Sequence, residues 1–90
     1  MKTLRIFISG IVQGVFFRDF IKQEAENLGL KGYVRNLEDS RVEVVIEGYD
    51  NEVNKMIEVC KKGSPYSKVM EIEIEKIENQ GFDNFKILRF

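Results

Sequence analysis

Alternating side chains along three stretches of the chain predict β-strands, because a period of two places every second residue on the same face of a sheet. These stretches span residues 4–9, 41–47 and 69–77. The alternation is clearest along Met70, Glu71, Ile72, Glu73, Ile74 and Glu75. Residues 31–36 have an extended character, and the polar turn at 36–40 joins them to 41–47 as a predicted hairpin. A last short strand contains Phe85 and Ile87.

Two further stretches have apolar residues at helical spacing, and each predicts an amphipathic helix. The apolar face of the first consists of Phe17, Phe20, Ile21, Ala25 and Leu28. The apolar face of the second consists of Val53, Met56, Ile57 and Cys60. Gly29 and Gly63 are suited to end these helices, and Asp50 is suited to cap the start of the second.

The predicted order is strand, helix, strand, strand, helix, strand, followed by a short terminal strand. A split β-α-β unit of this kind gives an antiparallel sheet with two helices on one face. With right-handed crossovers this is the α+β ferredoxin-like two-layer sandwich. No repeat or linker divides the chain, so residues 1–90 are expected to form one domain.

The composition excludes several kinds of chemistry. The chain has no histidine, which rules out a histidine general base, a Ser-His-Asp triad and a histidine-ligated metal. Its single cysteine, Cys60, excludes an internal disulfide and thiolate-rich zinc sites, and fits a reducing cytoplasmic compartment. A net charge of −1 gives no long-range attraction to nucleic acid or anionic membrane. No signal peptide or membrane-spanning apolar run is visible.

The segment 10–18, which reads GIVQGVFFR, is the strongest candidate for a functional site. It joins the first strand to the first helix, and an arginine at a helix start is unfavourable by about 0.3–1 kcal/mol. An oxyanion held between loop amides and the Arg18 guanidinium would reverse that sign. Gly14 would let the backbone approach such a ligand, and the amides from Gln13 to Arg18 could form an anion nest. The alternative is a tight connection, with Arg18 solvated beside Asp19.

Asn36 is the second candidate. An asparagine before a turn commonly serves turn chemistry, whereas a functional Asn36 would use its amide to hold a water. Gln13 is interpreted as a residue that shapes the loop, and Cys60 as a core residue. The glutamate row at 71–75 is interpreted as a solvated face, and the pair Phe16–Phe17 as half core and half loop wall.

These residues resemble the signatures of the acylphosphatase family. The segment 10–18 is similar to the first signature, and GYVRN at 32–36, followed by VEV at 42–44 and Gly48, is similar to the second. The similarity extends over essentially the whole chain. It implies an enzyme that hydrolyses the carboxyl–phosphate bond of acyl phosphates to a carboxylate and inorganic phosphate, without metal or cofactor.

The resemblance also implies roles for individual residues. Arg18 would bind the phosphoryl group, and Asn36 would orient the attacking water. The phosphate-binding backbone would be that of Gln13, Gly14, Val15, Phe16, Phe17 and Arg18. The partner would be a small acyl phosphate, with no nucleic acid or membrane, and the enzyme is expected to be a cytoplasmic monomer.

Two positions depart from the family pattern. Asp39-Ser40 replaces the usual Asp-Gly, and serine tolerates a positive φ less well than glycine. Gly63-Ser64-Pro65 replaces the usual Gly-Pro-Pro at a place expected to be peripheral.

Two other function classes remain open from the sequence. A binding module of the same fold would keep Arg18 and the loop, sense an anion and hydrolyse nothing. An RNA-binding domain would need a basic, aromatic sheet face, which the glutamates at 71, 73 and 75 disfavour.

Overall fold

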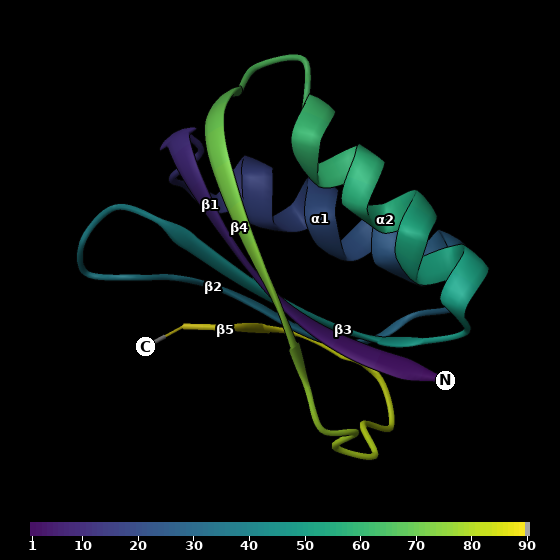
Figure 1. Cartoon of the computed structure of the whole chain (residues 1–90). Helices are drawn as coiled ribbons and strands as arrows, with labels where there is room; N and C mark the ends of the chain where they lie inside the picture. The colour runs from purple at the N-terminus through teal and green to yellow at the C-terminus, as the bar shows by residue number, and fades with distance from the viewer. Residues whose placement is uncertain (90) are drawn as a thin grey trace.

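A computed structural model describes residues 1–89 of the chain, and its elements follow the predicted order (Figure 1). They are β1 (Lys2–Ile11), α1 (Val15–Asn27), β2 (Lys31–Asn36), β3 (Val42–Gly48), α2 (Asp50–Lys62), β4 (Lys68–Ile77) and β5 (Phe85–Leu88). No helix in this part of the chain is long and apolar enough to cross a membrane.

The strands form one five-stranded sheet in the order β4-β1-β3-β2-β5. The pairings among β1, β2, β3 and β4 are antiparallel, as predicted. The fifth strand differs, because β5 pairs with β2 in parallel and makes the sheet mixed. The physical reason is direction: β2 runs opposite to β4, and β5 also runs back against β4 after the intervening loop. The two strands therefore point the same way at the far edge of the sheet.

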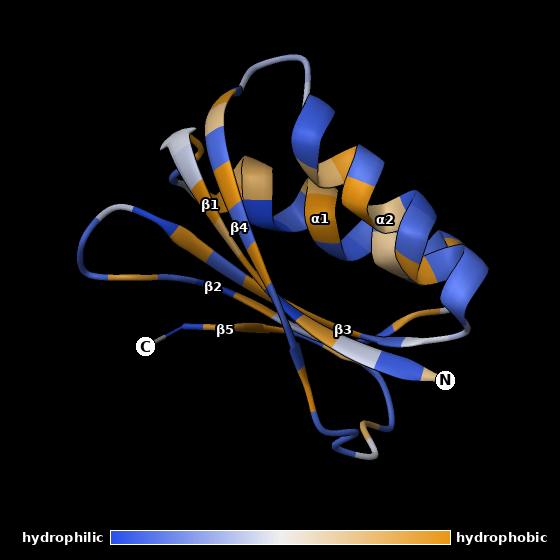
Figure 2. Ribbon diagram, in the orientation of Figure 1, coloured by the Kyte–Doolittle hydropathy of each residue, from blue (hydrophilic) through white to orange (hydrophobic). Residues whose placement is uncertain are grey.

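Both helices cover the same face of the sheet, as Figure 1 shows. Helix α1 packs over β2 and β5, whereas α2 packs over β1, β3 and β4. The apolar sides of the helices turn toward the sheet and their polar sides toward solvent (Figure 2). This confirms the α+β ferredoxin-like sandwich expected from the sequence.

The core lies between the helices and this face of the sheet. Its strand residues include Leu4, Ile6, Ile8, Val34, Val42, Val44 and Ile46, and its helix residues include Phe17, Ile21, Ala25, Val53, Met56 and Cys60. The prediction that Cys60 is a core residue is confirmed, since its side chain is fully buried. Burial raises the pKa of the Cys60 thiol to about 12, so it stays protonated and unreactive at neutral pH.

The second helix begins differently from the prediction. Its N-cap is Tyr49, and Asp50 is the first helical residue, so the expectation that Asp50 is the cap is wrong. No side chain makes a capping hydrogen bond there. The carboxylates of Asp50 and Glu52 still lie in the first turn, and Lys61 and Lys62 lie in the last. Both pairs carry the charge that complements the helix dipole.

Strand β3 is buried on both faces, including two glutamates that alternation alone would assign to solvent. Glu43 and Glu47 are each only 4% exposed. On the open face of the sheet, the side chains of Arg5 and Arg35 form ion pairs with Glu43. The loop between β4 and β5 covers Glu47 instead, because that carboxylate accepts hydrogen bonds from the Gln80, Gly81 and Phe82 amides.

Glu47 therefore anchors the segment that carries β5 to its edge position. The Thr3 hydroxyl also donates to it, at 2.6 Å. Burial alone would raise the pKa of Glu47, but the hydrogen bonds from Thr3 and the three amides outweigh burial and hold that pKa below its ordinary value. The charged form of Glu47 is therefore the one that stabilises the fold.

We expect Glu47→Gln to lower the free energy of unfolding by about 1–3 kcal/mol at pH 7, because a buried hydrogen-bonded charge is lost. Since folding lowers the pKa of Glu47, its stabilisation is fully present above the ordinary value of 4.5 and is lost as the pH falls through the folded value. Urea denaturation at pH 7 and at pH 3 measures both effects. The difference between wild type and variant should shrink at pH 3.

The matched control is Glu71→Gln, which alters an exposed carboxylate on β4. Its effect should stay within about 0.5 kcal/mol, as is usual for surface substitutions. Equal losses in the two variants, or a Glu47→Gln loss that does not change with pH, would contradict the assigned anchor.

Candidate functional site

The loop between β1 and α1 starts at a β-bulge that only glycine fits. The register of β1 against β4 shifts between Ser9 and Gly10. Gly10 has φ +135°, and a Cβ there would lie 2.1 Å from the carbonyl oxygen of Lys68. The close approach of β4 thus fixes where the chain leaves the sheet and turns toward the helix.

Gly14 is the N-cap of α1, and its surroundings are open. It has φ +112°, and a Cβ added there would meet nothing within 4 Å. Glycine is therefore needed for its backbone conformation and not for lack of space. Among residues 1–89, no hydrogen-bond acceptor is recorded for the amides of residues 13–17.

Helix α1 begins without any negative group. It has no capping side chain and no acidic residue in its first turn. Arg18 is its fourth residue, and its amide makes only a long 3.5 Å hydrogen bond to Gly14. The partial positive charge of this helix end is consequently uncompensated by the described part of the protein.

The Arg18 side chain makes no hydrogen bond or ion pair within residues 1–89. Its Nε is buried and makes no hydrogen bond, and no ion pair joins Arg18 to Asp19. The part of the alternative that makes Asp19 the partner of Arg18 therefore finds no support in the structure.

Asn36 is the last residue of β2 and faces the helices. It pairs with Val42, which in turn pairs with Ile8 on β1. Residues directly opposite one another in antiparallel strands share a face, and Ile8 and Val42 are both core residues. Two strand spacings separate Asn36 from Ile8, about 10 Å.

Strand direction brings Asn36 and the start of α1 to the same end of the molecule. Strands β1 and β2 both run antiparallel to β3, so the C-terminal ends of β1 and β2 lie at the same end of the sheet. Helix α1 begins at that end and packs over β2. The amide loop, Arg18 and Asn36 therefore lie at the same end of the sheet, although Arg18 and Asn36 are 18 positions apart in the sequence.

The Asn36 amide is not used by the turn that follows it. Within the described chain, the turn is closed by Leu37 N–H to the Arg41 carbonyl, Ser40 N–H to the Leu37 carbonyl, and Arg41 N–H to the Asp39 carboxylate. The Asn36 Oδ1 is buried and has no hydrogen-bond partner. Turn chemistry therefore does not account for Asn36.

Three buried side-chain polar atoms in the described residues lack a hydrogen bond: Arg5 Nε, Arg18 Nε and Asn36 Oδ1. Arg5 Nε lies 3.2 Å from the Glu43 carboxylate, so its charge is neutralised. Arg18 Nε and Asn36 Oδ1 have no such compensation. Buried polar groups normally have a hydrogen-bond partner. These two atoms belong to Arg18 and Asn36, the two candidates of the sequence analysis.

Gln13 shapes the loop, as its side chain was predicted to do. Its Nε2 donates to the Ser40 carbonyl at 2.7 Å and to the Arg41 carbonyl at 2.9 Å. These bonds tie the amide loop to the turn between β2 and β3. The partners could not be read from the sequence, because they depend on strand register.

The two phenylalanines of the loop divide as predicted. Phe17 is 3% exposed and packs against Phe20, whereas Phe16 is 83% exposed. No sequence pattern singles out Tyr66, a lone aromatic residue in a polar turn, yet it borders the same small cleft as Phe16.

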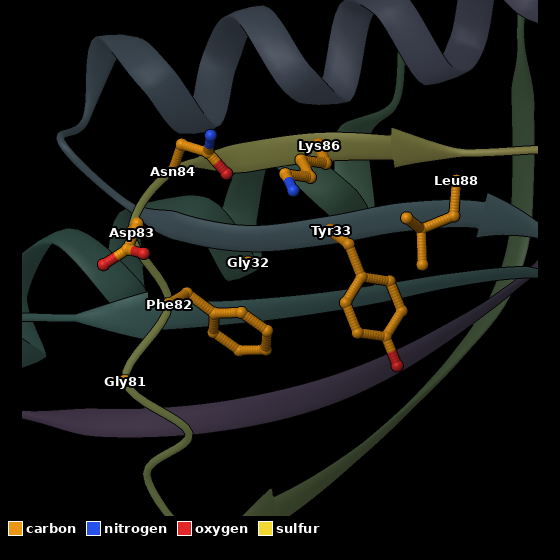
Figure 3. Close-up of a pocket in the computed structure, with 8 residues that line it drawn as sticks. All are labelled: Gly32, Tyr33, Gly81, Phe82, Asp83, Asn84, Lys86 and Leu88. Carbon is orange, nitrogen blue, oxygen red and sulfur yellow. The ribbon is translucent and has the colours of Figure 1, made fainter.

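A wider cavity, of about 400 Å³, lies away from all of these residues (Figure 3). It is lined by the start of β2, by β5 and by the loop before β5, with Tyr33 and Phe82 edge to face at 6.0 Å. Gly32 begins this wall, four residues before Asn36, at the opposite end of β2. The cavity holds none of the predicted site residues. The part of the chain described also contains no group of three His, Cys, Asp or Glu side chains that could hold a metal ion.

Ser40 is the one non-glycine residue with positive φ in the described chain, at +75°. Serine here adopts the left-handed conformation for which glycine is better suited. The cost falls on a turn that matters to the site, because the Ser40 carbonyl accepts the hydrogen bond from Gln13.

Comparison with known proteins identifies relatives along nearly the whole chain. Residues 4–87 match the model of the acylphosphatase family. An acylphosphatase of Haloarcula marismortui is 43% identical over 91% of this chain and 90% of its own length. One of Syntrophobacter fumaroxidans is 47% identical over 96% of this chain and 90% of its own length. The crystal structure of the Bacillus subtilis acylphosphatase superposes with a TM-score of 0.93 at 40% identity, covering 98% of this chain and 99% of that one.

We expect Ser40→Gly to raise the free energy of unfolding by about 0.5–1 kcal/mol. The left-handed conformation costs a residue with a Cβ about 1–2 kcal/mol, and the greater freedom of glycine in the unfolded chain offsets about 0.5–1 kcal/mol of that gain. Urea denaturation measures the change. Ser40→Ala is the matched control, because alanine keeps the Cβ and should bring no gain. Equal stabilisation by both substitutions would contradict strain at this position.

Proposed function

The chain belongs to the acylphosphatase family and is an acylphosphatase enzyme, and we propose that Arg18, Asn36 and the amides of residues 13–17 carry out its reaction. The observation that carries this proposal is the pair of buried polar atoms without partners, Arg18 Nε and Asn36 Oδ1. Each would gain its missing hydrogen bond when a phosphoryl group and a water occupy the site.

The phosphoryl group binds between the amide loop and Arg18. The amides of Gln13, Gly14, Val15, Phe16 and Phe17 have no recorded acceptor within the described protein. The guanidinium can meet two oxygens of one phosphoryl group with its planar fork. Donors fixed in advance stabilise charge on the phosphoryl oxygens without reorganising during the reaction.

Asn36 orients the attacking water. Its Oδ1 accepts a hydrogen bond from the water, which directs a lone pair of the water oxygen at phosphorus. The side chain can hold this orientation because Asn36 is fixed by its pairing with Val42 at the end of β2. Phosphoryl transfer depends mainly on such positioning together with charge stabilisation.

The reaction then needs no further protein group. The water oxygen bonds to phosphorus, the bond from phosphorus to the acyl oxygen breaks, and its electron pair leaves on the carboxylate. The proton of the water passes to a non-bridging oxygen of the substrate's own phosphoryl group. A carboxylate leaves without protonation by a strong acid, which suits a chain without histidine.

The products are a carboxylate and inorganic phosphate, and the enzyme acts as a monomer on small acyl phosphates without metal or cofactor. Turnover of an aryl acyl phosphate should persist in excess chelator. No observation favours the anion-sensing alternative, and the exposed glutamates Glu71, Glu73 and Glu75 of β4 argue against RNA binding.

Arg18→Ala should lower kcat/KM by about 10³-fold or more, since the charge clamp on the phosphoryl group is lost. Arg18→Lys should recover little of this, because a point charge lacks the fork. Steady-state kinetics with an aryl acyl phosphate measures both variants.

The control for general loss of positive charge is Arg41→Ala. Arg41 lies on the turn beside the site, but its guanidinium is already bonded to the Asp39 carboxylate at 2.8 Å. Its removal should change kcat/KM by no more than about threefold, the scale of a surface charge effect. Near-full activity of Arg18→Lys would refute bidentate binding.

Asn36→Ala should lower kcat by about 10²–10³-fold, as loss of one positioned polar group does. The inhibition constant of inorganic phosphate should stay within about threefold of wild type, because Asn36 contacts the water and not the anion. Urea denaturation of the same variant controls for folding. A parallel loss of phosphate affinity would show that Asn36 supports the anion site instead of the water.

A further inference from the structure

Three exposed apolar side chains gather beside the amide loop. Ile11, Phe16 and Tyr66 are 69%, 83% and 93% exposed. They line one small cleft of about 130 Å³, together with Gly14 and the turn that follows α2. Single exposed apolar residues are ordinary, but this group surrounds one hollow at the edge of the anion site.

The order of the strands puts this cleft and Asn36 on opposite sides of the loop. Tyr66 lies just before β4, whose first residue, Lys68, pairs with Ile11 at the end of β1. Asn36 lies on the other side, on β2, beyond β3. The loop that leaves β1 therefore lies between the water-holding amide and the apolar cleft.

This arrangement sets the direction of the leaving group. In phosphoryl transfer the attacking and leaving oxygens lie roughly in line on opposite sides of phosphorus. A water held on the Asn36 side drives the acyl oxygen out on the side of Phe16 and Tyr66. We propose that the cleft receives the acyl group of the substrate, and that Phe16 and Tyr66 give the enzyme a preference for aromatic acyl phosphates over acetyl phosphate. This inference rests on the roles proposed above for Arg18 and Asn36.

The cleft suits a ring in size and in chemistry. An apolar cavity of about 150 Å³ can hold one benzene molecule. No charged side chain lines the cleft, and the Gln13 side chain, which does, is already bonded to the Ser40 and Arg41 carbonyls. The Ser67 hydroxyl donates to the Ser64 carbonyl and accepts from the Ser64 amide, at 3.0 and 2.8 Å. Most of the surface left for an acyl group is therefore apolar.

The turn that presents Tyr66 is held in place before any substrate arrives. The two hydrogen bonds of Ser67 close it, and the Ser67 amide adds a third, to the Ser64 carbonyl at 3.1 Å. Pro65 restricts the backbone between them. Because the backbone that carries Tyr66 is already ordered, ligand binding has less conformational freedom to remove, and more of the contact contributes to binding.

The test compares two substrates, benzoyl phosphate and acetyl phosphate, in wild type and Tyr66→Ala. The variant should lose about 3- to 10-fold in kcat/KM for benzoyl phosphate, the scale of one aromatic contact. For acetyl phosphate it should stay within about twofold, and the inhibition constant of inorganic phosphate should not change. Tyr66→Phe keeps the ring and should keep the wild-type ratio of the two substrates.

Tyr49→Ala is the matched control, an exposed tyrosine at 73%. It follows Gly48, which pairs with Lys2 at the opposite end of the sheet, so the substrate ratio should not change. A Tyr66→Ala enzyme with the wild-type ratio would overturn the acyl cleft. Arg18→Ala distinguishes the acyl cleft from the phosphoryl site, because it should lower kcat/KM for both substrates alike. Full activity of Arg18→Ala would overturn the phosphoryl site itself, whatever the ratio.

Discussion

The proposed chemistry depends on a positive helix end that no acidic group compensates in the described part of the chain. Helix α1 starts at a bare glycine, has no acid in its first turn and carries Arg18 as its fourth residue. Helix α2 in the same chain shows the ordinary solution, with Asp50 and Glu52 at its start and Lys61 and Lys62 at its end. The start of α1 therefore lacks the electrostatic stabilisation that the start of α2 has. A bound dianion would restore it, and this is how the proposed function links the sequence of the loop to phosphoryl chemistry.

The rest of the molecule holds that helix end in place. Gly10 lets β4 approach β1 so closely that the loop leaves the sheet at a fixed point. Gln13 ties the loop to the turn between β2 and β3, and the same hairpin presents Asn36. On the open face of the sheet, ion pairs stabilise the buried carboxylate of Glu43, and amide hydrogen bonds stabilise that of Glu47. The sheet thus supports the donors that, in the proposed mechanism, must not move during the reaction.

The sequence was sufficient for the element order and the helix-covered face, and the roles of Arg18 and Asn36 stay predictions. Strand alternation and helical spacing are local properties, so the apolar helix face that carries Phe17 and Ile21 could be predicted directly, and both side chains lie in the core. The parallel pairing of β5 was missed because it depends on where a loop crosses the sheet. The burial of Glu43 and Glu47 was missed for a similar reason, since their partners are distant in sequence. Asp50 was assigned as a cap from residue type, while the backbone makes Tyr49 the cap.

The most direct test of the central claim is a titration of the uniformly ¹⁵N-labelled protein with inorganic phosphate, followed by two-dimensional NMR in excess chelator. The account predicts that the largest changes occur at the backbone amides of Gln13 to Phe17 and at the Nε–H of Arg18. Changes concentrated at the cavity between Tyr33 and Phe82, with the loop amides unmoved, would contradict it.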